Sequence, residues 1–153
     1  MKKLFILLVA LSVLLQTAAP QKAKKDKGAE PDGYKFTTLV SLPATPVKNQ
    51  AATGTCWCFA TTSFMESELL RMGKGEYDLS EMFIVRNNYI NKIKDNYLRQ
   101  GRGNLGEGSI STSWMHVFSD KGIVPQEAYP GLLPGENLPN HRELSAYIEA
   151  FAG

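Results

Sequence analysis

The sequence predicts a mainly helical domain over residues 34–153, and two observations support this fold class. Apolar side chains recur at intervals of three and four residues in several segments after residue 55, which is the spacing of amphipathic helices. Glycines and prolines separate these segments, for example at Gly73 and in residues 122–125. No internal repeat is evident. We therefore expect one small domain, or part of one.

The first helix is expected from Cys56 to Met72, with its end at Gly73. Cys56 and Cys58 lie about 200° apart around a helix of 3.6 residues per turn, so their thiols point in nearly opposite directions. We assign Cys58 to the core, and a redox or metal role for Cys-Trp-Cys is the alternative. The core-facing stripe of this helix is expected to be Cys58, Thr62, Met65, Leu69 and Met72.

A second helix is expected to begin at the capping-box-like Asp78-x-x-Glu81 and to run to about Arg99. Its apolar side would carry Met82, Tyr89, Ile93 and Tyr97. Residues 100–108 then form a glycine-rich loop. A phosphate-binding role for this loop is disfavoured, because no strand precedes it and no Lys-Ser or Lys-Thr pair follows it.

Two further helices complete the predicted domain. The third is expected over residues 110–121, stopped by Gly122, with Ile110, Trp114, Val117 and Phe118 facing inward. An extended piece begins at Ile123-Val124-Pro125, and turns follow at residues 129–131 and 134–135. The last helix is expected over residues 141–151, with Leu144, Ile148 and Phe151 on its apolar side.

The N-terminal residues have the pattern of a targeting signal. Lys2 and Lys3 precede an apolar run from Leu4 to Leu15, and Ala18 and Ala19 follow it. About a dozen apolar residues is short for a bilayer span of ~20. We therefore expect a signal peptide over residues 1–19 and a secreted or periplasmic protein, with an uncleaved anchor as the alternative.

Residues 20–33 are lysine-rich and nearly free of apolar side chains, so we expect a flexible basic linker. A patch for a membrane surface or an acidic partner is the alternative for this segment. The formal net charge of +2 sits largely in the linker and the signal, so nucleic-acid binding is not indicated. No stable membrane span is expected after removal of the signal.

The segment from Gln50 to Phe59 carries the clearest chemistry. Cys56 begins a predicted helix behind a turn that contains Gly54, and the helix dipole there favours thiolate over thiol. Gln50 is neutral, so its amide can donate to a developing oxyanion without quenching the nucleophile. The arrangement predicts attack by Cys56 on a carbonyl group, and no cofactor or metal is expected.

This segment resembles the active-site segment of papain-like cysteine peptidases. The match comprises Val47-Lys48-Asn49-Gln50 and Gly54-x-Cys56-Trp57-x-Phe59. By this resemblance Cys56 is the catalytic nucleophile and Gln50 the oxyanion-hole donor, while Trp57 packs over the site. Asn104-Leu105-Gly106 matches the loop that runs beside the substrate backbone, so Asn104 and Gly106 become candidate substrate-binding residues.

One departure from papain and the cathepsins indicates a branch of the family. Those enzymes usually carry a disulfide cysteine three residues before the nucleophile, where this chain has Thr53. A Ser or Thr at that position is closer to the bleomycin hydrolase and aminopeptidase C branch. Tyr77-Asp78-Leu79-Ser80-Glu81 and residues 122–125 agree with this branch, and the resemblance covers roughly residues 40–130.

The resemblance implies an α+β papain-like cysteine proteinase fold, of which this chain carries mainly the helical half without the β-rich half. It also implies peptide substrates, trimming from the amino end, and homo-oligomers in full-length relatives. Papain-like enzymes place their catalytic His and Asn ~130–150 residues after the cysteine. The chain ends at Gly153, 153 − 56 = 97 residues after Cys56.

His116 is expected to be an exposed bystander on the third helix, and His141 a polar residue at the start of the last helix or in the loop before it. Neither matches a catalytic position of the family. We therefore expect an exported cysteine peptidase that is incomplete and inactive on its own. The alternative is a catalytically inactive remnant that binds peptide or a partner. Thiol–disulfide exchange is disfavoured, because Cys56 and Cys58 lack C-x-x-C spacing.

Overall fold

The computed structural model describes residue 34 and residues 36–152. The chain divides into two units, Met1–Leu39 and Val40–Gly153, and the second unit carries the helices of the described residues and every candidate site residue. The expected signal peptide (residues 1–19) and basic linker (residues 20–33) lie outside the described residues.

The second unit is helical in the part that the structure describes. Its helices are α2 (Cys56–Arg71), α3 (Glu81–Leu98), α4 (Ser111–Lys121) and α5 (Arg142–Ala152). Pairing of extended backbone among the described residues is limited to two isolated bridges, Ala52 with Asn140 and Leu79 with Pro125. The expectation of the helical half of the fold is therefore confirmed.

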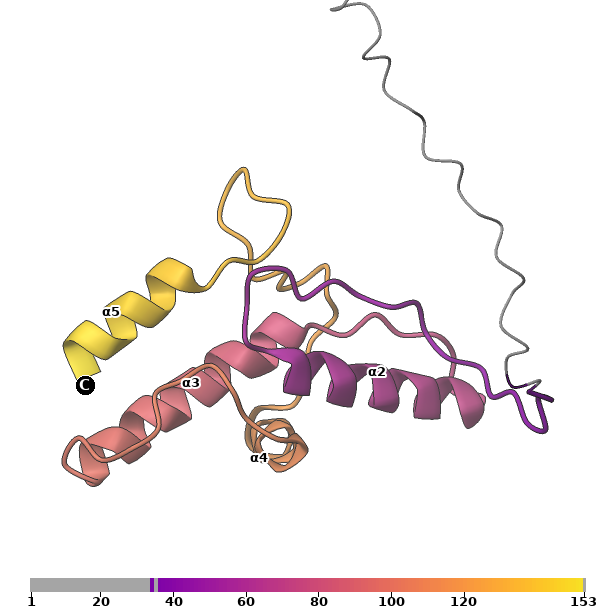
Figure 1. Ribbon diagram of the computed structural model, residues 1–153, viewed down its shortest axis with the longest axis horizontal. Coiled ribbons are helices and arrows are strands. Elements are labelled where there is room, and N and C mark those ends of the chain that lie inside the picture. The colour runs from indigo at the N-terminus through magenta and orange to yellow at the C-terminus, as the bar shows by residue number, and fades with distance from the viewer. Residues whose placement is uncertain (1–33, 35, 153) are drawn as a thin grey trace, which may run out of the picture. The chain divides into compact units, whose positions relative to one another are not determined.

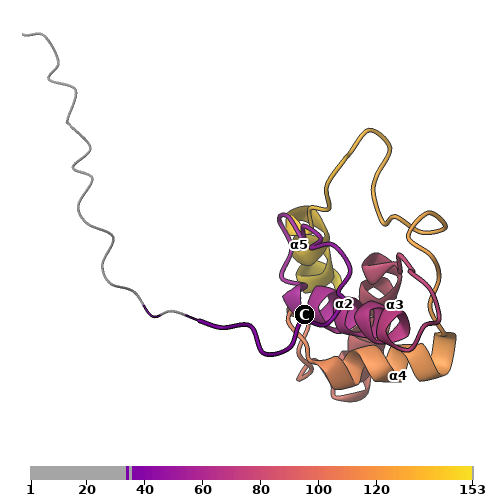
Figure 2. The ribbon, with the colours of Figure 1, turned by 90° about the vertical axis from the view of Figure 1, so that its right-hand side faces the viewer.

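Helix α3 is the centre of this arrangement, because it contacts α2, α4 and α5. Helix α4 crosses α2 and α3 steeply: it is seen end-on in Figure 1 and lengthwise in Figure 2, where α2 and α3 run into the page. Among the described helices, α5 packs on α3 alone. None of the helices in the described part of the chain is both long and apolar enough to cross a membrane.

The core lies where α2, α3 and α4 meet and extends toward α5. Trp114 on α4 is 1% exposed, and its indole nitrogen donates a hydrogen bond to Thr62 Oγ1 on α2 at 2.9 Å. This bond satisfies the polar end of a large buried side chain. The buried apolar cluster consists of Trp57, Cys58, Met82, Ile84, Val85, Tyr89, Trp114, Val117 and Ile148.

Several side chains that the sequence assigned to apolar faces are exposed. Helical spacing identifies which side chains share a face, but it does not say how far along the helix a neighbour covers that face. The residues concerned lie near helix ends or beyond a packing partner, namely Met72 (52% exposed), Ile93 (36%), Tyr97 (82%), Ile110 (64%), Phe118 (38%), Leu144 (41%) and Phe151 (86%).

The helix boundaries follow local signals, with one correction. Helix α2 ends in a Schellman motif: Gly73 has φ +68°, its N–H donates to Leu70 O, and the N–H of Lys74 donates to Leu69 O. Helix α3 does not begin with the predicted capping box. Its N-cap is Ser80, whose hydroxyl accepts the N–H of Phe83 at 3.0 Å. The Glu81 carboxylate is instead bound by Lys48.

Candidate functional site

Cys56 is the first residue of α2, directly after the N-cap Thr55, and it is exposed. The carbonyl of Thr55 accepts the N–H groups of Cys58 and Phe59 at 2.8 and 3.2 Å, so the helix is formed from its first turn. The first N–H groups of a helix have no intrahelical acceptor, and they point toward a ligand placed at its N-terminus. The thiol and its backbone N–H therefore stand at the positive end of α2.

Gln50 is held in the loop that leads into Cys56. Its Nε2 donates to the carbonyl of Thr53 at 2.7 Å, and Thr53 Oγ1 donates to the carbonyl of Gln50 at 2.8 Å. This reciprocal pair orients the amide and leaves its second N–H for another acceptor. Between them Ala51 has φ +49°, an uncommon conformation for a non-glycine residue.

Cys58 occupies the opposite side of α2 and is completely buried. Its thiol donates to the carbonyl of Glu81 at 3.4 Å, and burial raises the pKa of Cys58 to about 12. Cys58 therefore stays a protonated thiol at neutral pH. The assignment of Cys58 to the core is confirmed.

Lys48 anchors the chain just before Gln50. Its ammonium group lies 2.9 Å from Glu66 Oε1, 2.9 Å from Glu81 Oε1 and 2.6 Å from Asp78 Oδ1. Glu66 also accepts the hydroxyl of Thr45 and the N–H of Leu79. This Lys48 cluster joins the segment that carries Gln50 to both α2 and α3.

Asn104 and Gly106 lie in an exposed loop that α3 supports. Asn104 Oδ1 accepts the N–H of Gly106 at 2.9 Å, and the ammonium group of Lys92 donates to the carbonyls of Gly106 and Gly108. Burial lowers the pKa of Lys92. These bonds shape the loop, and the substrate-binding role of Asn104 and Gly106 stays a prediction.

Glu107, in the same loop, contacts the residues on both sides of Cys56. Its carboxylate accepts the N–H of Gly54, and its backbone carbonyl accepts the indole N–H of Trp57 at 3.1 Å. Sequence reasoning missed Glu107, because a glutamate in a glycine-rich loop carries no periodic or motif signal of its long-range partners.

His141 directly precedes α5, as expected, and its side chain is buried. The N–H of His141 donates to the carbonyl of Ala52 at 3.2 Å, which draws the start of α5 against the loop before Cys56. Its Nδ1 lies 3.5 Å from Glu107 Oε2, and its ring packs edge-on against Tyr89. Burial lowers the pKa of His141, although Glu107 opposes this shift.

Neither histidine is joined to Cys56 by a hydrogen bond among residues 36–152, which contain both. His116 is exposed on α4, as expected. In the same part of the chain, no group of three His, Cys, Asp or Glu side chains is placed to hold a metal ion.

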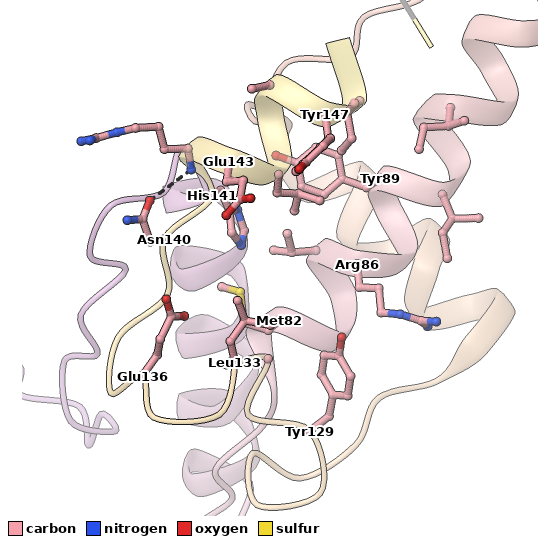
Figure 3. A pocket seen from close by; sticks show the side chains of 18 residues that line it. Met82, Arg86, Tyr89, Tyr129, Leu133, Glu136, Asn140, His141, Glu143 and Tyr147 are labelled. Atoms are coloured by element: carbon pink, nitrogen blue, oxygen red, sulfur yellow. Dashed lines mark hydrogen bonds between the residues drawn. The ribbon is translucent and has the colours of Figure 1, made fainter. Parts of the chain in front are cut away.

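A cavity of about 970 Å³ lies between α3, α5 and residues 129–140 (Figure 3). His141 and Tyr89 face it from the start of α5 and from α3, and Met82 and Leu133 form part of its apolar wall. Neither Cys56 nor Gln50 lines it. The cavity is therefore not the place where Cys56 would meet a substrate.

Comparison with known proteins identifies a family for most of the chain. Residues 36–142 match the family described as papain family cysteine protease. Cathepsin L2 of Homo sapiens and cathepsin K of Mus musculus are each 30% identical over 86 residues, which is 56% of this chain and 23% of each relative. Testin-2 of Mus musculus is 28% identical over 102 residues, 67% of this chain and 28% of the relative.

The chain thus spans less than a third of the length of these relatives. The family match nevertheless covers well over half of the chain and includes both Gln50 and Cys56. The chain belongs to the papain family of cysteine proteases.

Proposed function

We propose that this chain supplies the nucleophile and the oxyanion donors of a cysteine peptidase. The Cys56 thiolate attacks the carbonyl carbon of a peptide bond, and a carbon–sulfur bond forms as the carbonyl oxygen becomes an oxyanion. The carbon–nitrogen bond then breaks, and the leaving amine takes a proton from solvent. Water attacks the resulting thioester, the carbon–sulfur bond breaks, and a carboxylic acid and the free Cys56 thiol are released. The supporting observation is the exposed Cys56 at the first residue of α2, with Gln50 held in the same loop.

The donors at this position have distinct contributions. The dipole of α2 stabilises negative charge at its N-terminus by about 0.3–1 kcal/mol. Hydrogen-bond donors aimed at the oxyanion contribute more, and removal of one typically lowers the rate by about 10²–10³-fold. Gln50 Nε2 and the backbone N–H of Cys56 are the two donors that we assign to this role.

We further propose the bleomycin hydrolase and aminopeptidase C branch, an exported protein, and trimming of peptides from the amino end. The residue at the position of the usual disulfide cysteine supports the branch. Thr53 there donates to the carbonyl of Gln50 and shares a hydrogen bond with Thr55 Oγ1, so its hydroxyl serves the loop that a disulfide would otherwise constrain.

The test of the nucleophile is covalent labelling by a peptidyl acyloxymethyl ketone, followed by intact mass and peptide mapping. We expect one adduct on Cys56, none in Cys56→Ala, and slower labelling in Gln50→Ala by about 10²-fold. The matched control is Gln100→Ala, which removes an exposed glutamine that lies outside the loop leading into Cys56. Peptide binding without an adduct would favour the inactive, peptide-binding alternative.

The branch has its own test with the same chemistry. A reagent with a free α-amino group and its N-acetylated form are compared on the same protein. Faster labelling by the free amine supports an aminopeptidase. Equal rates would contradict that assignment and leave the role of Cys56 intact.

A further inference from the structure

Glu107 connects three separate segments beside Cys56. Its Oε2 accepts the N–H of Gly54, its Oε1 accepts the hydroxyl of Ser145 on α5 at 2.9 Å, and its backbone carbonyl accepts the indole N–H of Trp57. His141 Nδ1 approaches the same Oε2 at 3.5 Å. One residue of the glycine-rich loop thus bonds to the Cys56 loop, to α2 and to α5.

The two bonds to the Cys56 segment bracket the nucleophile. Gly54 precedes Cys56 by two residues and Trp57 follows it by one, so the backbone on both sides of the thiol is tied to Glu107. A hydrogen bond from a backbone N–H to a carboxylate is charge-assisted, and it is about twice as strong as one between neutral groups. Thr53 bonds within its own loop, to Gln50 and Thr55, and so does not duplicate this link.

Close packing accompanies the hydrogen bond. A Cβ atom at Gly54 would lie 2.9 Å from the Cβ of Glu107, which is nearer than such atoms approach in proteins. Glycine at position 54 is therefore what lets the carboxylate of Glu107 reach the backbone N–H. Glu107 is itself held from the other side, because Ser145 fixes its second oxygen and the side chain is only 23% exposed.

We propose that Glu107 is a positioning residue for the peptidase reaction, which sets the direction of the Cys56 thiol and N–H relative to Gln50 and the substrate loop. This inference rests on the proposed function of Cys56. Glu107 touches no reacting atom in this account. It acts through Gly54 and Trp57, and it holds the glycine-rich loop at a constant distance from the nucleophile.

The test compares two thiol reagents on the 153-residue chain. A peptidyl acyloxymethyl ketone requires the oriented thiol and the oxyanion donors, whereas iodoacetamide requires only an accessible thiol. Because Cys58 is buried, both rates report on Cys56. The ratio of the two rate constants therefore measures positioning separately from exposure.

We expect Glu107→Ala to lower this ratio by about 10- to 100-fold, the effect of a misplacement of about 1 Å, with the iodoacetamide rate changed less than about twofold. Glu107→Gln keeps an oxygen for Gly54 and should recover most of the ratio. Ser145→Ala removes a bond to the same carboxylate without touching Gly54, and it should leave the ratio within about threefold of wild type.

A second pair of variants approaches the contact from the other side and applies even if Glu107→Ala fails to fold. Gly54→Ala pushes against Glu107 and should lower the ratio as Glu107→Ala does. Gly108→Ala is the matched control, because a Cβ there meets no atom within 4 Å.

An unchanged ratio in Gly54→Ala and Glu107→Ala would overturn the inference. So would variants in which the rates with the peptidyl reagent and with iodoacetamide fall equally while the melting temperature also falls, since that result indicates a loss of folding. If the wild-type chain reacts with iodoacetamide but not with the peptidyl reagent, the proposed function itself fails. That outcome is distinct from the loss of the ratio in the Glu107 variants alone.

Discussion

Replacement of Lys48 by methionine tests how the segment before Gln50 is held. Methionine keeps much of the length of the side chain and removes its charge. The ammonium group of Lys48 lies 2.9 Å from both Glu66 and Glu81, whose side chains are 1% and 3% exposed. The substitution therefore leaves two carboxylates buried without their cation.

The expected cost is about 3–5 kcal/mol, the range for removal of one partner from a buried ion pair. The lower end applies here, since Glu66 keeps two hydrogen-bond donors, Thr45 Oγ1 and the N–H of Leu79. For a chain of this size the loss corresponds to a fall in melting temperature of roughly 10–15 °C. The double variant Lys48→Met, Glu81→Gln should recover part of the lost stability.

The pH dependence has a definite sign. Burial raises the pKa of Glu81 even though Lys48 opposes the shift. A carboxyl group with a raised folded-state pKa stabilises the fold at low pH and loses that contribution as pH rises through the folded-state pKa. Removal of Lys48 raises the pKa of Glu81 further, so the deficit of Lys48→Met should shrink as the pH falls from 7 toward 5.

The stabilising contribution of Lys48 itself is lost at high pH rather than at low pH. Burial acts to lower its pKa, but the hydrogen bonds to Asp78, Glu66 and Glu81 outweigh burial and hold the pKa above its ordinary value. Its contribution in the wild-type chain is therefore complete at neutral pH and is lost only as the pH rises above the ordinary lysine pKa of ~10.4.

The assay is urea unfolding followed by tryptophan fluorescence at pH 7 and pH 5. Lys94→Met, at an exposed position on α3, is the matched control and should change stability by less than about 0.5 kcal/mol. The reasoning is refuted if Lys48→Met matches this control at pH 7, or if its deficit grows as the pH falls.

Three further predictions follow from the described residues. A maleimide should label Cys56 well before Cys58, whose burial raises its pKa to about 12, and peptide mapping that finds Cys58 labelled first would contradict the site. The purified chain should show little or no turnover of peptidyl substrates. General acid–base catalysis, typically worth about 10²–10⁴-fold in rate, needs an imidazole at Cys56. Robust turnover that Cys56→Ala abolishes would reveal a base that we have missed. Gly131→Ala should lower the melting temperature far more than Gly135→Ala, because both glycines have positive φ but only a Cβ at Gly131 would overlap the side chain of Met82. Equal shifts in the two variants would speak against this packing.

Local sequence signals predicted the helices and part of the core well. Trp114 and Val117 are buried where helical spacing places them, and Gly73 and Gly122 mark the ends of α2 and α4. The placement of Cys56 and Cys58 on opposite sides of α2 follows from the same geometry. Side chains two positions apart in a helix are always separated by about 200° around its axis.

Contacts between distant segments could not be predicted in this way. Glu107 meets Gly54 across 53 positions, and His141 is buried because the chain after residue 130 returns to Ala52. The path of a loop depends on many weak contacts at once, and a single glutamate or histidine carries no spacing that reveals its partner. The Lys48 cluster was missed for the same reason, since its carboxylates come from α2, α3 and the loop between them.

The central claim is that Cys56 attacks a carbonyl group whose oxygen is held by Gln50. A peptide aldehyde with ¹³C at its carbonyl carbon tests this step without need of a catalytic base, because addition of the thiol to the aldehyde gives a tetrahedral hemithioacetal. The free aldehyde and its hydrate give signals of their own, and the hemithioacetal carbon has a chemical shift distinct from both. The account predicts a hemithioacetal ¹³C signal with the wild-type chain, a weaker one with Gln50→Ala and none with Cys56→Ala. A hemithioacetal signal that persists in Cys56→Ala, or no adduct with the folded wild-type chain, would contradict it.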